Sequence, residues 1–334
     1  MQSLPAPDLS VVLVAYRYSE PLRWTLERVC RQSVSSRIEC VLVTPSTADT
    51  AGISEMLKSL ICFRIVEAGP LKTAGEAKAA GVRAARAPLV AFLEDHTFPD
   101  EFWAESLMEA HGRDDFAVVG PVVRNANPTC AASWGCFLVY YGPYMWARPE
   151  DEIRHLPANH SCYRRDLLLD YGPGLAEMLE AEAVLHQDLL SKGHRLFQEP
   201  SAVAYHLNYA SLGPALREYY LASRVFAVER AFGWKFCRRA VYTAGSPILP
   251  LLRLLRVLEE ARRAELGRRV LWSAMAPVFL TLCAGAAGEM LGYALGAGRA
   301  REKLMGFEQD RDKAFSEADL EVLRGVQDCV ISRS

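Results

Sequence analysis

The chain has 334 residues, of which 51% are hydrophobic and 23% are charged, and its formal net charge at pH 7 is −2. These values describe a globular protein with one large domain or two ordinary ones, and they exclude a disordered chain. Because nucleic-acid-binding proteins usually carry a basic excess, the near-neutral balance argues against nucleic acid as a partner.

The cysteines and the N-terminus bear on the cellular compartment. The nine cysteines form no CxxC pair, which argues against a disulfide framework and a thiolate zinc site and favours a reducing cytosol. The first ten residues, MQSLPAPDLS, contain neither a basic region nor an apolar one, so no secretory signal peptide is expected.

Strand and helix patterns alternate over the first hundred residues. Short apolar runs predict strands, and the runs between them have helical spacing. The predicted strands are residues 9–15, 38–43, 63–66 and 89–93, and the predicted helices are residues 19–29, 53–60 and 73–87. Ser19 is a suitable N-cap for the first helix, and Pro21 suits its first turn. This alternation predicts an α/β fold with a parallel sheet, which binds ligands at the carboxyl ends of its strands.

Glu94, Asp95 and His96 follow the fourth predicted strand directly. A polar turn that leaves the core is the simplest explanation of such a cluster. The carboxyl end of a parallel strand, however, is where a ligand site is expected, and that position favours a functional role. No G-x-G-x-x-G follows the first strand and no P-loop motif occurs, so a dinucleotide fold and a P-loop are both disfavoured.

Aromatic residues and glycines become frequent between residues 120 and 165, and flat aromatic faces suit sugar rings. The segment LPANHSCYRRDLL is read as a loop followed by the start of a helix. A helical stretch with three glutamates then ends near Gly193, and a short strand at residues 202–205 leads into His206.

Four ordered segments together resemble the family 2 glycosyltransferases with a GT-A fold. They are SVVLVAYRYSEPLRWTLERVCRQS, GEAKAAGVRAARAPLVAFLEDH, LPANHSCYRRDLL and EAEAVLHQDLLSKGHRLFQEPSAVAYHL. The resemblance covers about residues 9–208 and depends on the order and spacing of the motifs. It implies a GT-A-like, mostly parallel sheet flanked by helices. It also implies an inverting, hexosyltransferase-type enzyme that moves a sugar from a nucleotide-sugar donor to a cell-envelope, lipid-linked or polysaccharide acceptor.

The resemblance assigns Glu94, Asp95 and His96 to the metal motif of the family and His206 to the distal histidine that completes the site. A divalent cation held there would neutralise the leaving diphosphate. His96 stands where the family usually has aspartate. Imidazole suits Mn²⁺ better than Mg²⁺, so Mn²⁺ is favoured. Glu94 and Asp95 are also expected to contact the donor, Asp95 through its ribose.

The resemblance also assigns the catalytic base. Glu182 falls where the family has this carboxylate, Glu180 is a close competitor, and Ala181 replaces the acidic residue that precedes the base in the family. A base of this kind takes the proton of the acceptor hydroxyl. A solvated helix face is the alternative for either glutamate.

Further donor and acceptor residues follow by position. The usual aspartate after the second strand is missing, because Thr44-Pro45-Ser46 stands there. Whether the donor is UDP-, GDP- or TDP-linked therefore stays open. The remaining residues expected to bind the donor are Ala15, Tyr16, Arg17, Thr44 and Lys78. The residues expected on the acceptor side are Trp134, Asn159, His160, Arg164 and Arg165.

Two apolar segments lie in the C-terminal third, at about residues 240–258 and 270–298. The second contains one charged residue, Glu289, and its glycines at 288, 292 and 296 recur every four residues. Because both flanks are basic, the positive-inside rule favours interfacial or re-entrant helices on the inner leaflet over a single crossing. A buried soluble helix or a homodimer interface is the alternative. We therefore expect a catalytic domain over residues 1–210 and a helical, membrane-associating region over residues 211–334, peripheral or monotopic on the cytoplasmic face.

Two other functions remain open at this point. A sugar nucleotidyltransferase uses a similar sheet, but it normally needs a glycine-rich basic loop after the first strand, and VAYRYSEP has no glycine. A catalytically degenerate, nucleotide-sugar-binding membrane scaffold would account for the replacements at Thr44, His96 and Ala181.

Overall fold

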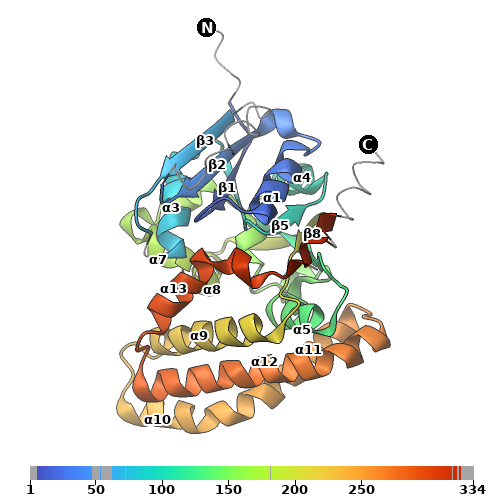
Figure 1. The fold of residues 1–334 in the computed structure, drawn as a ribbon. Helices are drawn as coiled ribbons and strands as arrows, with labels where there is room; N and C mark the ends of the chain where they lie inside the picture. Colours follow the sequence, from blue (N-terminus) through green and yellow to red (C-terminus); the bar gives the residue numbers. More distant parts are fainter. Residues whose placement is uncertain are drawn as a thin grey trace. The chain divides into compact units, whose positions relative to one another are not determined.

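The computed structural model describes residues 6–46, 53, 62–71, 73–180, 182–317, 319–321 and 323–324 (Figure 1). The chain divides into two compact units, which are described separately. The first comprises Met1–Arg124 and Tyr144–His206, and the second comprises Asn125–Pro143 and Leu207–Ser334. The expected domain boundary at residue 210 stays a prediction. Apart from Ile53, the helix expected at residues 53–60 lies outside the described residues, as does Ala181.

Eight strands of the described residues form one sheet in the order β3-β2-β1-β4-β7-β6-β8-β5. The strands are β1 Leu9–Val14, β2 Ile38–Thr44, β3 Cys62–Glu67, β4 Leu89–Leu93, β5 Thr97–Pro99, β6 Phe116–Asn125, β7 Cys162–Arg164 and β8 Arg195–His206. The expected parallel arrangement holds for β3, β2, β1 and β4. Beyond them, β7 is antiparallel to both β4 and β6, and β5 is antiparallel to β8, so the sheet is mixed.

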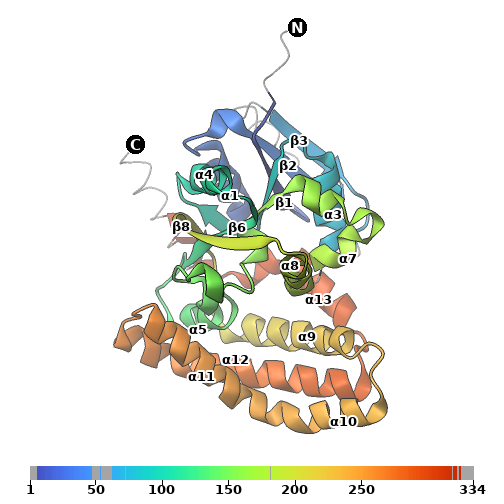
Figure 2. The same cartoon turned by 180° about the vertical axis from the view of Figure 1, so that it is seen from behind.

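Helices of the first unit lie on both faces of this sheet (Figures 1 and 2). They are α1 Glu20–Cys30, α3 Ala74–Ala84, α4 Trp103–Arg113, α6 Arg165–Leu169, α7 Leu175–Glu180 and α8 Glu182–Ser191. Short 3₁₀ turns are η1 Ser35–Arg37, η4 Gly142–Tyr144, η5 Glu150–Glu152, η6 Ala158–His160 and η7 Gly172–Gly174. The predicted cap of α1 is confirmed, because the Ser19 hydroxyl accepts a hydrogen bond from the backbone N–H of Leu22 at 3.2 Å.

Successive side chains of each strand pack alternately into two separate hydrophobic cores. Leu13 of β1 packs in the cluster that includes α1 and α4, whereas its neighbour Val12 packs in the cluster that includes α3, α7 and α8. All of these positions are buried, as expected for strands covered on both faces. The first unit is therefore a three-layer α/β/α arrangement, with the carboxyl ends of β1, β2 and β4 at one edge.

The second unit is helical in its described part. Its helices are α5 Ala131–Tyr140, α9 Leu212–Arg230, α10 Phe236–Gly245, α11 Leu249–Arg263, α12 Arg268–Leu295 and α13 Ala300–Gln309, with 3₁₀ turns η8 Ser246–Ile248 and η9 Arg311–Ala314. The glycines of α12 allow close packing on α9, since a Cβ added at Gly288 would lie 2.2 Å from the Tyr220 carbonyl oxygen. Gly292 meets α9 in the same way, but Gly296 lies after the end of α12 with φ 79° and is not part of this helix face.

Two helical segments of the described residues are long and apolar enough to cross a membrane by length and composition. They are Phe236–Arg263, which contains α10, η8 and α11, and Arg268–Leu295, which is α12. The single acidic residue of the second segment, Glu289, is 2% exposed and pairs with Arg253 of α11. The charge of Glu289 is thus neutralised between two helices of the same unit.

Candidate functional site

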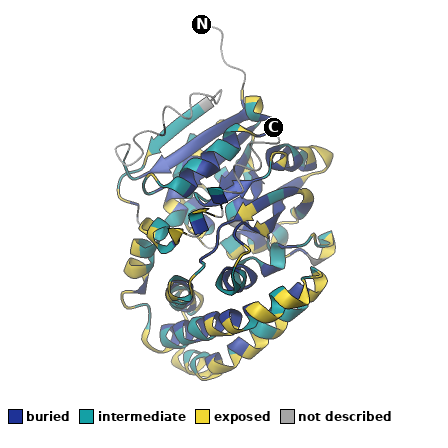
Figure 3. Ribbon diagram, turned by 45° about the vertical axis from the view of Figure 1, so that its right-hand side comes forward, coloured by how far each residue is buried: buried dark blue, intermediate teal, exposed yellow. Residues whose placement is uncertain are grey.

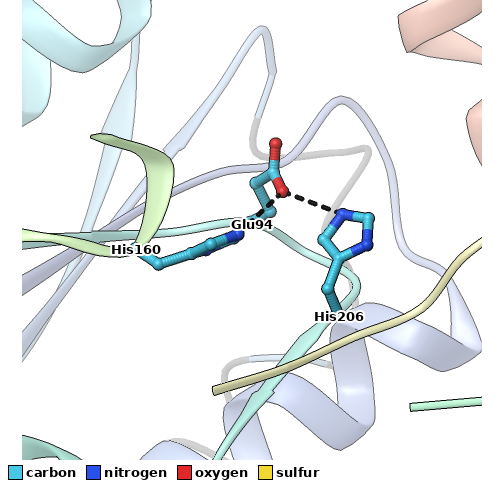
Figure 4. A group of neighbouring side chains, drawn as sticks. All are labelled: Glu94, His160 and His206. Atoms are coloured by element: carbon cyan, nitrogen blue, oxygen red, sulfur yellow. Dashed lines mark ion pairs between the residues drawn. The ribbon is translucent and has the colours of Figure 1, made fainter. Parts of the chain in front are cut away.

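A carboxylate and two imidazoles of the first unit converge at the end of β4. Glu94 Oε2 lies 3.1 Å from His206 Nε2 and 3.4 Å from His160 Nε2 (Figure 4). One potential ligand atom from each residue lies within 4.8 Å of those of the other two. We call Glu94, His160 and His206 the Glu–His–His cluster.

The antiparallel strand pairs assemble this cluster from three distant segments. Glu94 directly follows β4. Because Ala91 of β4 is opposite Cys162 at the start of β7, the antiparallel register brings Asn159 and His160, just before β7, beside the end of β4. The register of β5 on β8, with Thr97 opposite His206, brings the end of β8 to the same place.

The electrostatics of the cluster suit a bound cation. Burial lowers the pKa of His160 to about 3 against the opposing effect of Glu94, so this imidazole is neutral at pH 7. Burial alone would raise the pKa of Glu94, but the hydrogen bond with His206 and the surrounding imidazoles hold it well below the usual range. An ionised carboxylate beside neutral imidazole nitrogen is a donor set for a divalent transition metal.

The other two residues of the expected metal motif are engaged differently. His96 Nδ1 lies 2.7 Å from Asp95 Oδ1, and His96 Nε2 is 3.9 Å from Glu94 Oε2, beyond hydrogen-bond distance. The His96 ring packs edge-on against that of His206, with centroids 4.7 Å apart. His160, which the sequence placed on the acceptor side, occupies the position beside Glu94. Its inclusion could not be read from the sequence, because the antiparallel pairing of β7 with β4 was not predicted.

A chain of hydrogen bonds connects the cluster to Glu182 at the start of α8. Asn159 Nδ2 donates to Glu94 Oε1 at 2.7 Å, and Lys78 Nζ of α3 donates both to Asn159 Oδ1 and to Glu182 Oε1. Burial raises the pKa of Glu182, and the Lys78 ammonium opposes this effect. Lys78 and Asn159, assigned by position to the donor and the acceptor, thus meet each other between Glu94 and Glu182.

Glu180 has a different partner. Its Oε2 accepts a hydrogen bond of 2.6 Å from the backbone N–H of Gly75 in the first turn of α3. A carboxylate in this position satisfies one of the free N–H groups at a helix N-terminus and is attracted by the helix dipole. Glu180 is thus engaged at the start of α3, whereas Glu182 contacts the Lys78 ammonium.

The residues expected to bind the nucleotide lie at the edge where the carboxyl ends of β1 and β2 meet. Ala15, Tyr16 and Arg17 follow β1, and Thr44 ends β2. The Thr44 hydroxyl donates to the Ser46 carbonyl at 3.1 Å, which stabilises the local turn. These strands are parallel to β4, so the four residues share an edge of the sheet with Glu94.

Within the first unit, the acceptor-side candidates Arg164 and Arg165 are not brought to the cluster. Arg164 lies at the far end of β7, where it pairs with Asp115 and, at 2.8 Å, with Asp166. Arg165 donates to the carbonyl of Val82 at 3.0 Å near the end of α3. Trp134 belongs to α5 of the second unit, where its Nε1 donates to the Pro128 carbonyl at 3.0 Å.

Comparisons with known proteins agree with this architecture. Residues 10–172 match the family model described as Glycosyl transferase family 2. The chain is similar in structure to the mannosyltransferase PcManGT from Pyrobaculum calidifontis in complex with GDP-Man and Mn²⁺. That likeness has 16% sequence identity and a TM-score of 0.50 and covers 96% of this chain and 84% of that one. Residues 1–349 of TarS from S. aureus give 13% identity and a TM-score of 0.45, covering 89% of this chain and 92% of that one. No curated protein sequence matches significantly.

At 16% identity the likeness to PcManGT supports the fold alone, and the match to the family model supports the family. The matched residues run from β1 to the start of η7 and include Glu94, Asn159 and His160. The chain is a glycosyltransferase whose residues 10–172 form a family 2 domain with a GT-A fold.

Proposed function

We propose that the protein is an inverting, divalent-cation-dependent hexosyltransferase that uses a nucleotide-sugar donor. The observation that carries this proposal is the Glu–His–His cluster at the carboxyl edge of the parallel strands, connected through two side chains to Glu182. In an open α/β sheet this edge is where a nucleotide would bind.

Glu94, His160 and His206 would hold the cation. Once bound, it would neutralise the negative charge of the nucleoside diphosphate leaving group. Two imidazoles and one carboxylate favour Mn²⁺ over Mg²⁺, which prefers an all-oxygen shell. His96 and Asp95 would then support the site, His96 by packing on His206 and Asp95 by holding the His96 ring.

Glu182 would act as the base. Its carboxylate accepts the proton of the acceptor hydroxyl while that oxygen attacks the anomeric carbon and the bond to the diphosphate breaks on the opposite face. Lys78 favours the ionised form of Glu182 against the effect of burial. A base needs this form, so the Lys78–Glu182 pair supports the assignment.

We also propose that the protein is peripheral or monotopic on the cytoplasmic face of a membrane and that its acceptor is lipid-linked or a polysaccharide. The support is an exposed apolar face along α10, η8 and α11, visible as a run of exposed residues in Figure 3. It contains Val241, Ile248, Leu251, Leu252 and Leu255, which are 48–68% exposed. Water-exposed side chains of this size in one row are typical of an interaction surface.

The first experiment measures release of nucleoside diphosphate by the purified protein from UDP-, GDP- and TDP-sugars, with Mn²⁺, Mg²⁺ or EDTA. GDP-mannose heads the screen because PcManGT binds GDP-Man. We expect release from one donor that needs the cation. His160→Ala is expected to weaken Mn²⁺ binding by about tenfold or more, since it removes a direct ligand.

His194→Ala is the matched control, because His194 follows α8 and is not a member of the Glu–His–His cluster. Equal Mn²⁺ affinity in His160→Ala and the unmodified protein would contradict the proposed metal site. Binding of a donor without turnover under any condition would instead favour a degenerate, nucleotide-sugar-binding scaffold.

A further inference from the structure

We propose that Lys78 and Asn159 are positioning residues that connect Glu182 to the Glu–His–His cluster, so that cation binding and the base form one electrostatic unit. We call this pair the Lys78–Asn159 relay. The inference rests on the proposed function, in which Glu94 holds the cation and Glu182 takes the proton. It gives both linking residues a role other than the direct donor and acceptor contacts expected from their positions.

The hydrogen bonds fix the direction of the relay. The Asn159 amide nitrogen donates to the Glu94 carboxylate, and the Asn159 carbonyl oxygen accepts from the Lys78 ammonium. A flipped amide would turn its N–H groups toward the ammonium and its oxygen toward the carboxylate, which are two unfavourable contacts. The opposite charges at its two ends therefore hold Asn159 in a single orientation.

Partial burial strengthens the hydrogen bonds of Lys78. The Lys78 side chain is 12% exposed, and its ammonium lies 5.8 Å from the centroid of the Phe92 ring. Two of its three donors are committed to Asn159 and Glu182. Hydrogen bonds and ion pairs in such partly dehydrated surroundings are stronger than those in water. Lys78 is therefore held toward Glu182.

The charged groups at the two ends of the relay act on each other electrostatically. One side chain, Asn159, separates the Lys78 ammonium from the Glu94 carboxylate, so the charge of Lys78 acts on the cluster. Glu94 and Glu180 raise the pKa of Glu182, in addition to the larger effect of burial, while Lys78 lowers it. The charged groups that act on Glu182 thus come from α3, the end of β4 and the end of α7. Removing one charge should alter cation binding at the other end.

The test is a set of Mn²⁺ affinities, measured from the electron paramagnetic resonance signal of free Mn²⁺ in titrations of the full chain. It needs no knowledge of the donor. Glu182→Gln should weaken Mn²⁺ binding about fivefold or more, because it leaves the Lys78 ammonium uncompensated beside the cation site. Adding Lys78→Met to the same protein removes that charge and should restore affinity to within about twofold of the unmodified protein.

Asn159→Leu tests the connection itself, since leucine fills similar space and forms neither hydrogen bond. In that protein, Glu182→Gln should change Mn²⁺ affinity by less than about twofold. Glu177→Gln on the exposed side of α7 is the matched control for loss of one negative charge and should leave Mn²⁺ affinity unchanged. Circular dichroism of each variant establishes that it is folded.

Each outcome decides the proposal. Unchanged Mn²⁺ affinity in Glu182→Gln, or failure of Lys78→Met to restore it, would overturn the relay while leaving the metal site in place. If Glu182→Gln weakens Mn²⁺ binding equally in the unmodified protein and in Asn159→Leu, Asn159 does not connect the two sites. No Mn²⁺ binding by the unmodified protein would overturn the relay together with the proposed metal site, so the two failures are distinguishable.

Discussion

Glu180 and Glu182 are two positions apart in the chain, yet their carboxylates have different partners. Glu180 accepts the Gly75 N–H at the start of α3, whereas Glu182 pairs with Lys78, which also binds Asn159. The first contact stabilises a helix terminus, and the second favours the ionised form of a carboxylate whose pKa is raised by burial. Replacing Glu182 should therefore mainly lower activity, whereas replacing Glu180 should mainly lower stability.

Glu182→Gln should lower the rate of sugar transfer about 10²- to 10⁴-fold, the usual contribution of a general base, because the amide cannot take the proton. Glu180→Ala should retain most of the transfer rate but lose about 0.5–1.5 kcal/mol of unfolding free energy, because the Gly75 N–H in the first turn of α3 loses its acceptor. Both are measured with the donor that the screen identifies and by urea unfolding. If Glu180→Ala loses most of the transfer rate while Glu182→Gln retains it, Glu180 is the base and Glu182 is not.

The Glu–His–His cluster shows what a sequence can and cannot supply. Glu94 could be singled out because it follows an apolar run at the carboxyl edge of the parallel strands, and His206 was expected from the resemblance to the family. His160 in the cluster could not, because its place depends on the register of β7 on β4, and β7 has three residues with no strand pattern of its own. Nor could the partner of Lys78 be foreseen, since it depends on how α3 meets α7 and α8.

At the scale of elements, the parallel half of the fold was predictable and the antiparallel half was not. The strands β1, β2 and β4 are short apolar runs buried on both faces, a pattern that indicates parallel strands. The strand β5 has three residues and ends in proline, and β8 extends over twelve residues where the apolar pattern marked only four. Pairing with distant strands, rather than local sequence, defines these elements.

The contact between α3 and α7 lies just before Glu182, the proposed base, and Gly75 is at its centre. A Cβ added at Gly75 would lie 2.1 Å from the Ala176 carbonyl oxygen and 2.8 Å from the Glu180 nitrogen, both backbone atoms. The backbone of α7 could make room for this Cβ only if the whole helix moved away from α3. The close approach of α7 to α3, just before Glu182, therefore depends on the absence of a side chain.

Gly75→Ala should cost about 1–3 kcal/mol of unfolding free energy, because the added methyl group overpacks this helix contact. Gly112→Ala in α4 is the control, since nothing lies within 4 Å of its added Cβ. In that helix alanine should raise the unfolding free energy by up to about 1 kcal/mol. Urea unfolding of the two variants measures both effects. Equal stability of Gly75→Ala and the unmodified protein would show that α7 is free to shift.

At the scale of the whole molecule, the exposed apolar face bears on where the protein resides. From Val241 to Leu255 the face is about 21 Å long at about 1.5 Å of rise per residue, short of the ~30 Å hydrocarbon core of a bilayer. Arginines 238, 256, 262 and 263 lie near its two ends and are exposed. A short apolar face with cations at its ends suits a helix that lies in the plane of an anionic membrane surface.

We therefore expect the protein to float with vesicles that contain anionic lipid and to bind neutral vesicles less well, with binding weakened by salt. Leu255→Glu places a charge on this exposed apolar face and should reduce vesicle affinity about tenfold or more, given about 1.5–3 kcal/mol for burying a leucine in the membrane. Val184→Glu is the matched control, because Val184 is also a large exposed apolar residue, 51% exposed, but lies on α8 of the first unit. If Leu255→Glu floats as well as Val184→Glu, this face does not contact the membrane. If the unmodified protein instead forms a dimer that Leu255→Glu dissociates, the face is a homodimer interface, and the acceptor need not be lipid-linked.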